Sequence, residues 1–99
     1  AGEQQHANFK RVETIADLER EVTAAAAAGR LVMLEFYADW CTYCKVMEKE
    51  IFPHPQVVAA LQDFVLLQAD ITRQDDDDIA LAKHLQMPAP PALYFWDSQ

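Results

Sequence analysis

Residues 36–45 read FYADWCTYCK and contain the only two cysteines of this 99-residue chain, Cys41 and Cys44. They follow LVMLEFY at residues 31–37, an apolar run that a single acid interrupts. An apolar run of this length without alternation is typical of a strand buried in the centre of a sheet. We therefore expect the cysteine pair to lie where this strand ends and a helix begins.

Two cysteines at this spacing can form a structural disulfide, half of a zinc site or a redox centre. A structural disulfide over so short a loop restrains the unfolded chain only weakly. A zinc site needs further ligands, whereas His6, His54 and His84 stand far apart in the sequence. At a helix N-terminus, free N–H groups and the helix dipole stabilise a thiolate on the first cysteine. This position favours a redox centre over the other two interpretations.

The remaining sequence alternates between helical and strand patterns. The expected helices cover residues 14–29, 41–52, 57–61 and 75–85, and the expected strands 31–37, 64–69 and 92–96. Such alternation requires crossover connections and predicts an α/β fold with at least one parallel strand pair. No linker divides the chain, so we expect a single domain over residues 1–99, with residues 1–8 as a loose lead-in.

Composition and charge exclude several classes of function. The hydrophobic share of 52% with only two glycines indicates a globular chain. The net charge of −8 argues against binding to nucleic acid and to anionic membrane surfaces. No apolar run approaches the roughly 20 residues that span a bilayer, so we expect no membrane insertion by this segment.

Against this background, FYADWCTYCK resembles the active site of the thioredoxin family. The longer stretches at residues 32–57, 64–72 and 79–87 resemble the C-terminal periplasmic (gamma) domain of thiol:disulfide interchange proteins of the DsbD family. The resemblance implies a thioredoxin-like fold, with a central mixed sheet flanked by helices. It also implies that the usual final strand and helix after ALYFW, residues 92–96, are lacking, and that the domain is excised from a larger membrane protein.

The resemblance further implies an electron relay in the periplasm, as part of an inner-membrane protein that supports cytochrome c biogenesis. A transmembrane domain would donate electrons, and the disulfide-bearing N-terminal domain of the same protein would accept them. Cys41 matches the nucleophile and Cys44 the resolving thiol, with no metal or organic cofactor required. The alternatives are a generic thioredoxin-like disulfide reductase and, from another class, a redox-inactive binding module with a thioredoxin fold.

Two acids are candidates for tuning the pKa of the cysteines. Glu35 interrupts the apolar strand, and Glu48 follows Cys44 by four residues, so those two share one helix face. Acids matching these positions lie beneath the cysteine pair in the family, where an ionised carboxylate raises a thiol pKa. The plainer interpretations are a solvated helix surface for Glu48 and an edge-facing strand position for Glu35.

Four further residues are candidates for partner binding by the same resemblance. Trp40 and Tyr43 flank Cys41, and core packing is the alternative for Trp40. Pro91 matches the cis-proline that faces the active site in thioredoxin-like proteins. Pro90 departs from the family pattern, because proline has no N–H to donate to a partner strand.

Overall fold

The computed structural model describes residues 8–97, so nearly all of the predicted lead-in lies outside the described residues. The strands are β1 (Lys10–Arg11), β2 (Val32–Tyr37), β3 (Val65–Asp70) and β4 (Ala92–Trp96). The helices are α1 (Ile15–Ala27), α2 (Thr42–Val46), the π-helical segment η1 (Met47–Ile51), α3 (Pro55–Ala60) and α4 (Asp76–His84). The strands form one sheet in the order β1-β3-β2-β4.

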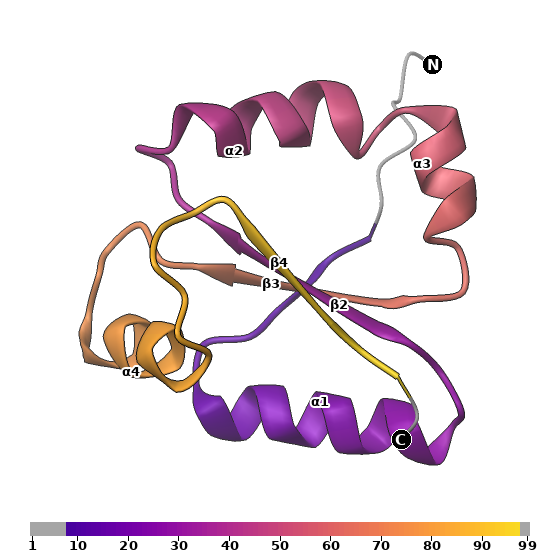
Figure 1. Ribbon diagram of the computed structural model, residues 1–99, viewed down its shortest axis with the longest axis horizontal. Helices are drawn as coiled ribbons and strands as arrows, with labels where there is room; N and C mark the ends of the chain where they lie inside the picture. Colours follow the sequence, from indigo (N-terminus) through magenta and orange to yellow (C-terminus); the bar gives the residue numbers. More distant parts are fainter. Residues whose placement is uncertain (1–7, 98–99) are drawn as a thin grey trace.

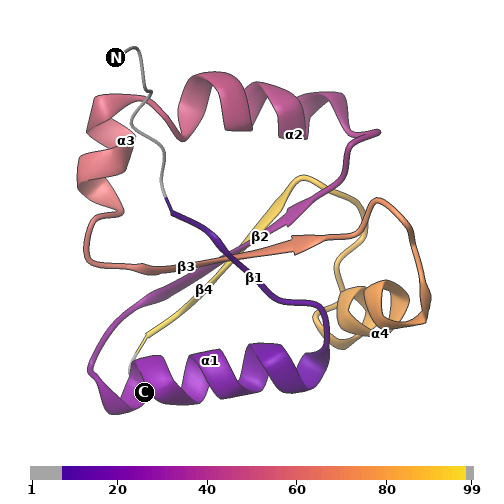
Figure 2. The same ribbon diagram turned by 180° about the vertical axis from the view of Figure 1, so that it is seen from behind.

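The sheet is mixed and has helices on both faces, as predicted. Strand β2 pairs in parallel with β3 and antiparallel with β4, while β1 pairs in parallel with β3. Figure 1 shows α1 and α4 on one face, and α2 and α3 on the other. In the view from behind, β1 crosses in front of the other strands (Figure 2). Within residues 8–97, no helix or strand follows β4.

The two faces of β2 serve different layers because side chains alternate along a strand. Leu34 and Phe36 are fully buried and belong to the core cluster that also contains Leu18 and Leu81 from α1 and α4. Met33 belongs to a smaller cluster with Leu66 and with Phe52, the residue that follows η1. Glu35 lies two positions after Met33 in β2, so both side chains point to the same face of the sheet. This is the face on which η1 packs against Met33.

Local capping signals define where α1 begins and ends. Thr14, at which the predicted helix starts, is the N-cap residue, and a reciprocal capping box joins it to Asp17. Gly29 adopts a positive φ of 68°, and the Arg30 N–H donates to the Ala25 carbonyl at 2.8 Å. A left-handed residue after a helix lets the chain reverse, and glycine adopts this conformation without a Cβ penalty. This turn brings the chain to the start of β2.

The helix predicted over residues 41–52 is present but changes type after Val46. The α-helical hydrogen bonds give way to a π-helical turn, in which the Phe52 N–H donates to the Met47 carbonyl at 2.8 Å. Such wide turns occur mostly as single insertions within helices, often at functional sites. Among the described residues, none of the helices is long and apolar enough to cross a membrane.

Candidate active site

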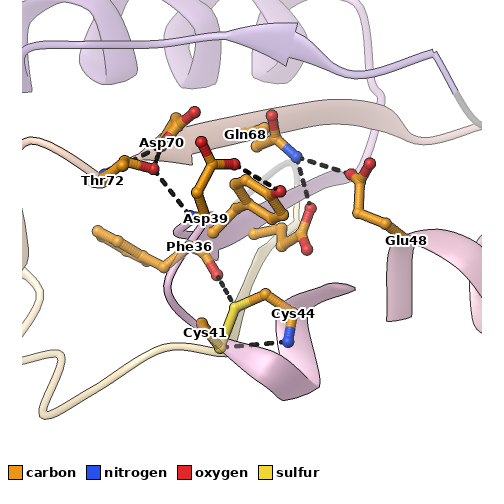
Figure 3. Close-up of a disulfide and its surroundings, with 10 residues drawn as sticks. Phe36, Asp39, Cys41, Cys44, Glu48, Gln68, Asp70 and Thr72 are labelled. Atoms are coloured by element: carbon orange, nitrogen blue, oxygen red, sulfur yellow. Dashed lines mark hydrogen bonds between the residues drawn. A yellow bond between two sulfur atoms is a disulfide. The ribbon is translucent and has the colours of Figure 1, made fainter. Parts of the chain in front are cut away.

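The site is built around a disulfide between Cys41 and Cys44 (Figure 3). Cys41 is the N-cap residue of α2, and its Sγ accepts a hydrogen bond from the Cys44 N–H at 3.1 Å. Cys41 retains 7% of its surface, whereas Cys44 is fully buried. Cys41 is thus the less buried of the two cysteines, and a backbone N–H already donates to its sulfur.

The second cysteine lies against the end of the central strand. The Sγ of Cys44 is 3.8 Å from the carbonyl oxygen of Phe36 in β2. The strand buries this sulfur because Phe36 and Cys44 belong to the same core cluster. A partner can therefore reach Cys44 only through Cys41.

Glu35 is fully buried in the middle of the sheet. The interpretation of Glu35 as an edge-facing residue is wrong, because β2 has a neighbouring strand on each side. Its Oε1 accepts a hydrogen bond from Nε2 of Gln68 at 3.0 Å, and no group among the described residues donates to its Oε2. Burial, reinforced by the charge of Glu48, raises the pKa of Glu35 to about 7, although the hydrogen bond from Gln68 opposes the shift.

Glu48 combines an exposed position with an inward contact. The residue is exposed to solvent, as the plainer interpretation expects. Its Oε2 nevertheless accepts a hydrogen bond from Nε2 of Gln68 at 3.1 Å. Figure 3 shows Gln68 on the sheet and Glu48 on the helix, with their side chains directed toward each other. The structure thus connects both predicted acids through a residue that the sequence analysis missed.

A signal for Gln68 is present in the sequence. It is the one polar residue in FVLLQA, residues 64–69, just as Glu35 is the one acid in its strand. The two residues are partners in the parallel register of β2 and β3. Two polar interruptions of buried strands satisfy each other here, which avoids the cost of burying either one without a hydrogen bond.

A second set of hydrogen bonds fixes the loop that carries Trp40. Its indole Nε1–H donates to the Thr72 carbonyl at 3.0 Å, and the Asp39 N–H donates to the Thr72 hydroxyl at 2.9 Å. The Tyr37 hydroxyl donates to Oδ1 of Asp39 at 2.9 Å. Burial and the neighbouring Asp39 raise the pKa of Tyr37 to about 12, so this hydroxyl keeps its proton and remains a donor at physiological pH.

The predicted partner-binding residues come from two segments, the one that carries the cysteines and the loop before β4. Trp40 is half exposed, which rules out simple core packing, and Tyr43 is exposed on α2. Trp40 and Pro90 line an open groove of about 250 Å³ that also includes Ile79 of α4. Pro91 is half-buried directly before β4, and the Pro90–Pro91 bond is cis, as predicted. In the part of the chain from residue 8 to residue 97, no His, Cys, Asp and Glu side chains are grouped in threes that could hold a metal ion.

Comparison with known proteins places these features in a family. A family model described as thioredoxin-like matches residues 13–98. The thiol:disulfide interchange protein DsbD of Ralstonia nicotianae is 50% identical over 91 residues, covering 92% of this chain and 15% of that protein. DsbD of Escherichia coli is 46% identical over 96 residues, covering 97% of this chain and 17% of that protein. The chain thus spans only about a sixth of the length of these relatives.

Solved structures agree with this comparison. The oxidised C-terminal domain of DsbD from Neisseria meningitidis superposes with a TM-score of 0.74 and 30% identity, covering 93% of this chain and 78% of that one. Mitochondrial thioredoxin 3 from Saccharomyces cerevisiae superposes with a TM-score of 0.68 over 90% of this chain and 74% of that one. Its identity of 18% supports the shared fold alone.

Proposed function

The chain belongs to the thioredoxin-like family and, within it, to the C-terminal domains of DsbD proteins; on this basis we propose that it is a dithiol:disulfide oxidoreductase. The observation that carries the proposal is the Cys41–Cys44 disulfide at the start of α2, in which Cys41 keeps a small exposed surface and Cys44 keeps none. A redox-inactive binding module is less well supported, because it would need neither the second cysteine nor the acids beneath the pair.

The proposed reaction is the reduction of a partner disulfide by the dithiol form. The Cys41 thiolate attacks one sulfur of the partner disulfide, forms a mixed disulfide and displaces the other partner sulfur as a thiolate. Cys44 then loses its proton and attacks Sγ of Cys41, which releases the second partner sulfur. Two electrons pass to the partner, and the Cys41–Cys44 disulfide is formed. The Cys44 N–H that donates to Sγ of Cys41 supports this order, since it stabilises charge on the attacking sulfur.

We further propose the relay that the DsbD relatives suggest. A transmembrane domain would reduce the Cys41–Cys44 disulfide, and the dithiol would pass electrons to the disulfide-bearing N-terminal domain of the same protein. This places the domain in the periplasm, attached to an inner-membrane protein, with a role in cytochrome c biogenesis. The name of the relatives supports disulfide exchange, and the small share of their length that this chain covers supports a domain within a larger protein. A generic thioredoxin-like reductase remains the alternative.

The surface around Cys41 is the proposed docking site for that partner. Trp40 and Tyr43 are the exposed aromatic residues on either side of the first cysteine, and exposed aromatic side chains are common anchors at interfaces. Pro90 and Pro91 belong to the loop before β4, and Pro90 shares a groove with Trp40. We propose that a partner segment lies across this groove while its disulfide faces Cys41.

A turnover assay tests the proposed activity. The chain is supplied with dithiothreitol and offered either a general disulfide-bonded protein or the oxidised N-terminal domain of a DsbD protein. We expect both disulfides to be reduced faster than by dithiothreitol alone, with a clear preference for the DsbD domain. Equal rates for the two would favour the generic reductase, and no acceleration by the folded chain would overturn the proposal.

The two acids are expected to raise the thiol pKa of Cys41 above that of a free cysteine. The helix N-terminus lowers the free energy of the thiolate by about 0.3–1 kcal/mol, and by up to about 2 when partly buried. An ionised carboxylate would raise it by about 3 kcal/mol if it lay about 6 Å from the sulfur at an effective dielectric constant near 20. Repulsion between the ionised carboxylates and the Cys41 thiolate should therefore outweigh the stabilisation of the thiolate by the helix N-terminus. The titration of thiolate absorbance in the reduced chain measures this balance.

Glu35→Gln and Glu48→Gln should each shift that titration to lower pH, and Glu50→Gln is the matched control. Glu50 is an exposed glutamate of the same η1 turn and has no hydrogen bond to Gln68 in the structure. A shift that is equally large in Glu50→Gln would show that general surface charge, not the buried pair, controls the thiol.

A further inference from the structure

We propose that Gln68 is a positioning residue for this chemistry, whose single side-chain nitrogen holds the carboxyl groups of Glu35 and Glu48 together beneath the helix that Cys41 caps. The inference rests on the proposed function, because the pair affects catalysis only if the cysteines exchange disulfides. The two hydrogen bonds from Gln68 to the carboxyl groups are nevertheless observed whether or not the chain has that function.

The amide nitrogen of Gln68 has two N–H groups, and each has a carboxylate acceptor. The distances from Nε2 are 3.0 Å to Oε1 of Glu35 and 3.1 Å to Oε2 of Glu48. Two oxygens that share one nitrogen at these distances lie within roughly 6 Å of each other, the range in which like charges affect each other's ionisation. Gln68 thus keeps two acids closer together than their mutual repulsion favours.

The three residues differ in how firmly the fold holds them. Glu35 and Gln68 are buried and lie opposite each other in adjacent parallel strands. Glu48 lies in the first turn of η1 and is largely exposed, so its side chain has water as an alternative partner. Without the amide, repulsion from an ionised Glu35 would turn the Glu48 carboxylate toward solvent. The role of Gln68 is therefore to retain Glu48.

A neutral donor suits this role better than a charged one. Arginine or lysine at this position would bind both carboxylates but would also offset one of their two negative charges, which would weaken their effect on the thiolate. The glutamine amide binds both carboxylates and adds no charge. The site therefore keeps its negative potential near the cysteines while the two acids remain in a fixed place.

The charge on Glu35 depends on the same contact. The groups facing Glu35 are Glu48 from η1 and Gln68 from β3, while its register partner in β4 is the apolar Leu93. The hydrogen bond from Gln68 lowers the pKa of Glu35, against burial and the charge of Glu48. Loss of the amide would leave Glu35 protonated over a wider pH range. Cys41 would then face less negative charge from both acids at once.

A double-mutant cycle on the reduced full chain tests the proposal. Thiolate absorbance is titrated in wild type, Gln68→Leu, Glu48→Gln and the double variant, with Gln62→Leu as the matched control. Gln62 is an exposed glutamine outside the helices and strands. We expect Gln68→Leu to lower the pKa of Cys41 by about one unit. The double variant should lie no lower than Gln68→Leu alone, because each change removes the same Glu48 charge from the site, one by releasing the side chain and the other by neutralising it.

An unchanged titration in folded Gln68→Leu, or additive shifts in the double variant, would overturn the proposal. Gln68→Met replaces the leucine variant if circular dichroism shows that Gln68→Leu does not fold, since methionine retains the length of the side chain. The titration requires no turnover, so its result is separate from that of the proposed function. If the titrations agree with the prediction but the chain reduces no disulfide, the role of Gln68 in holding Glu35 and Glu48 stands and the proposed function is wrong.

Discussion

Cys41→Ser is expected to abolish disulfide reduction, with a loss of about three orders of magnitude or more in turnover. Serine retains the size of the side chain, but its hydroxyl is far less acidic than a thiol and forms no mixed disulfide. The buried sulfur of Cys44 cannot replace the lost nucleophile, because the fold leaves it no exposed surface. The assay with dithiothreitol and a disulfide-bonded partner measures this loss.

Cys44→Ser should fail at a different step and thereby distinguish the two cysteines. Cys41 would still attack the partner, but no second thiol would release it, so a stable mixed disulfide should accumulate. Mass spectrometry under non-reducing conditions detects this adduct, and dithiothreitol should cleave it by reducing the mixed disulfide. An adduct formed by Cys41→Ser, with none formed by Cys44→Ser, would reverse the assigned roles.

The features that sequence analysis predicts correctly depend on residues close together in the chain. The capping box of Thr14 and Asp17 needs only one helical turn, and the strand-to-helix transition at Cys41 lies within FYADWCTYCK. The helix predicted from residue 75 likewise begins there, with Asp75 as the N-cap residue and three further aspartates in the first turn of α4. In each case the hydrogen bonds join neighbours, so the local sequence carries the information.

The missed features depend on contacts between distant segments. Strand β1 has two residues, too few for any alternation, and exists because β3 supplies its hydrogen bonds. The π-helical turn η1 has the composition of an ordinary helix. Gln68 acquires its role only through the register of β2 and β3, which places it opposite Glu35. A glutamine in an apolar strand signals a buried partner, but the sequence does not say which one.

Glu35→Gln is expected to stabilise the oxidised protein at pH 8 by on the order of 3 kcal/mol relative to wild type. The pKa of Glu35 rises from 4.5 to about 7 on folding, chiefly because the carboxyl group is buried. Below pH 4.5 the acid is protonated in both the folded and the unfolded chain, and its contribution to stability is complete. Between pH 4.5 and about 7 the unfolded chain ionises while the folded chain keeps the proton, so this contribution falls progressively and is lost once the pH has risen through about 7.

Urea unfolding between pH 4 and pH 8, with the disulfide intact so that no thiol titrates, measures the difference. Glutamine is neutral throughout this range and retains an oxygen that can accept the hydrogen bond from Gln68. The two proteins should therefore be similar in stability at pH 4 and diverge toward pH 8, whereas Glu50→Gln should follow wild type. Parallel curves for wild type and Glu35→Gln would mean that the buried carboxyl group ionises in the folded chain as readily as in water. Glu35 could then not act as a pH-dependent charge beneath the cysteines.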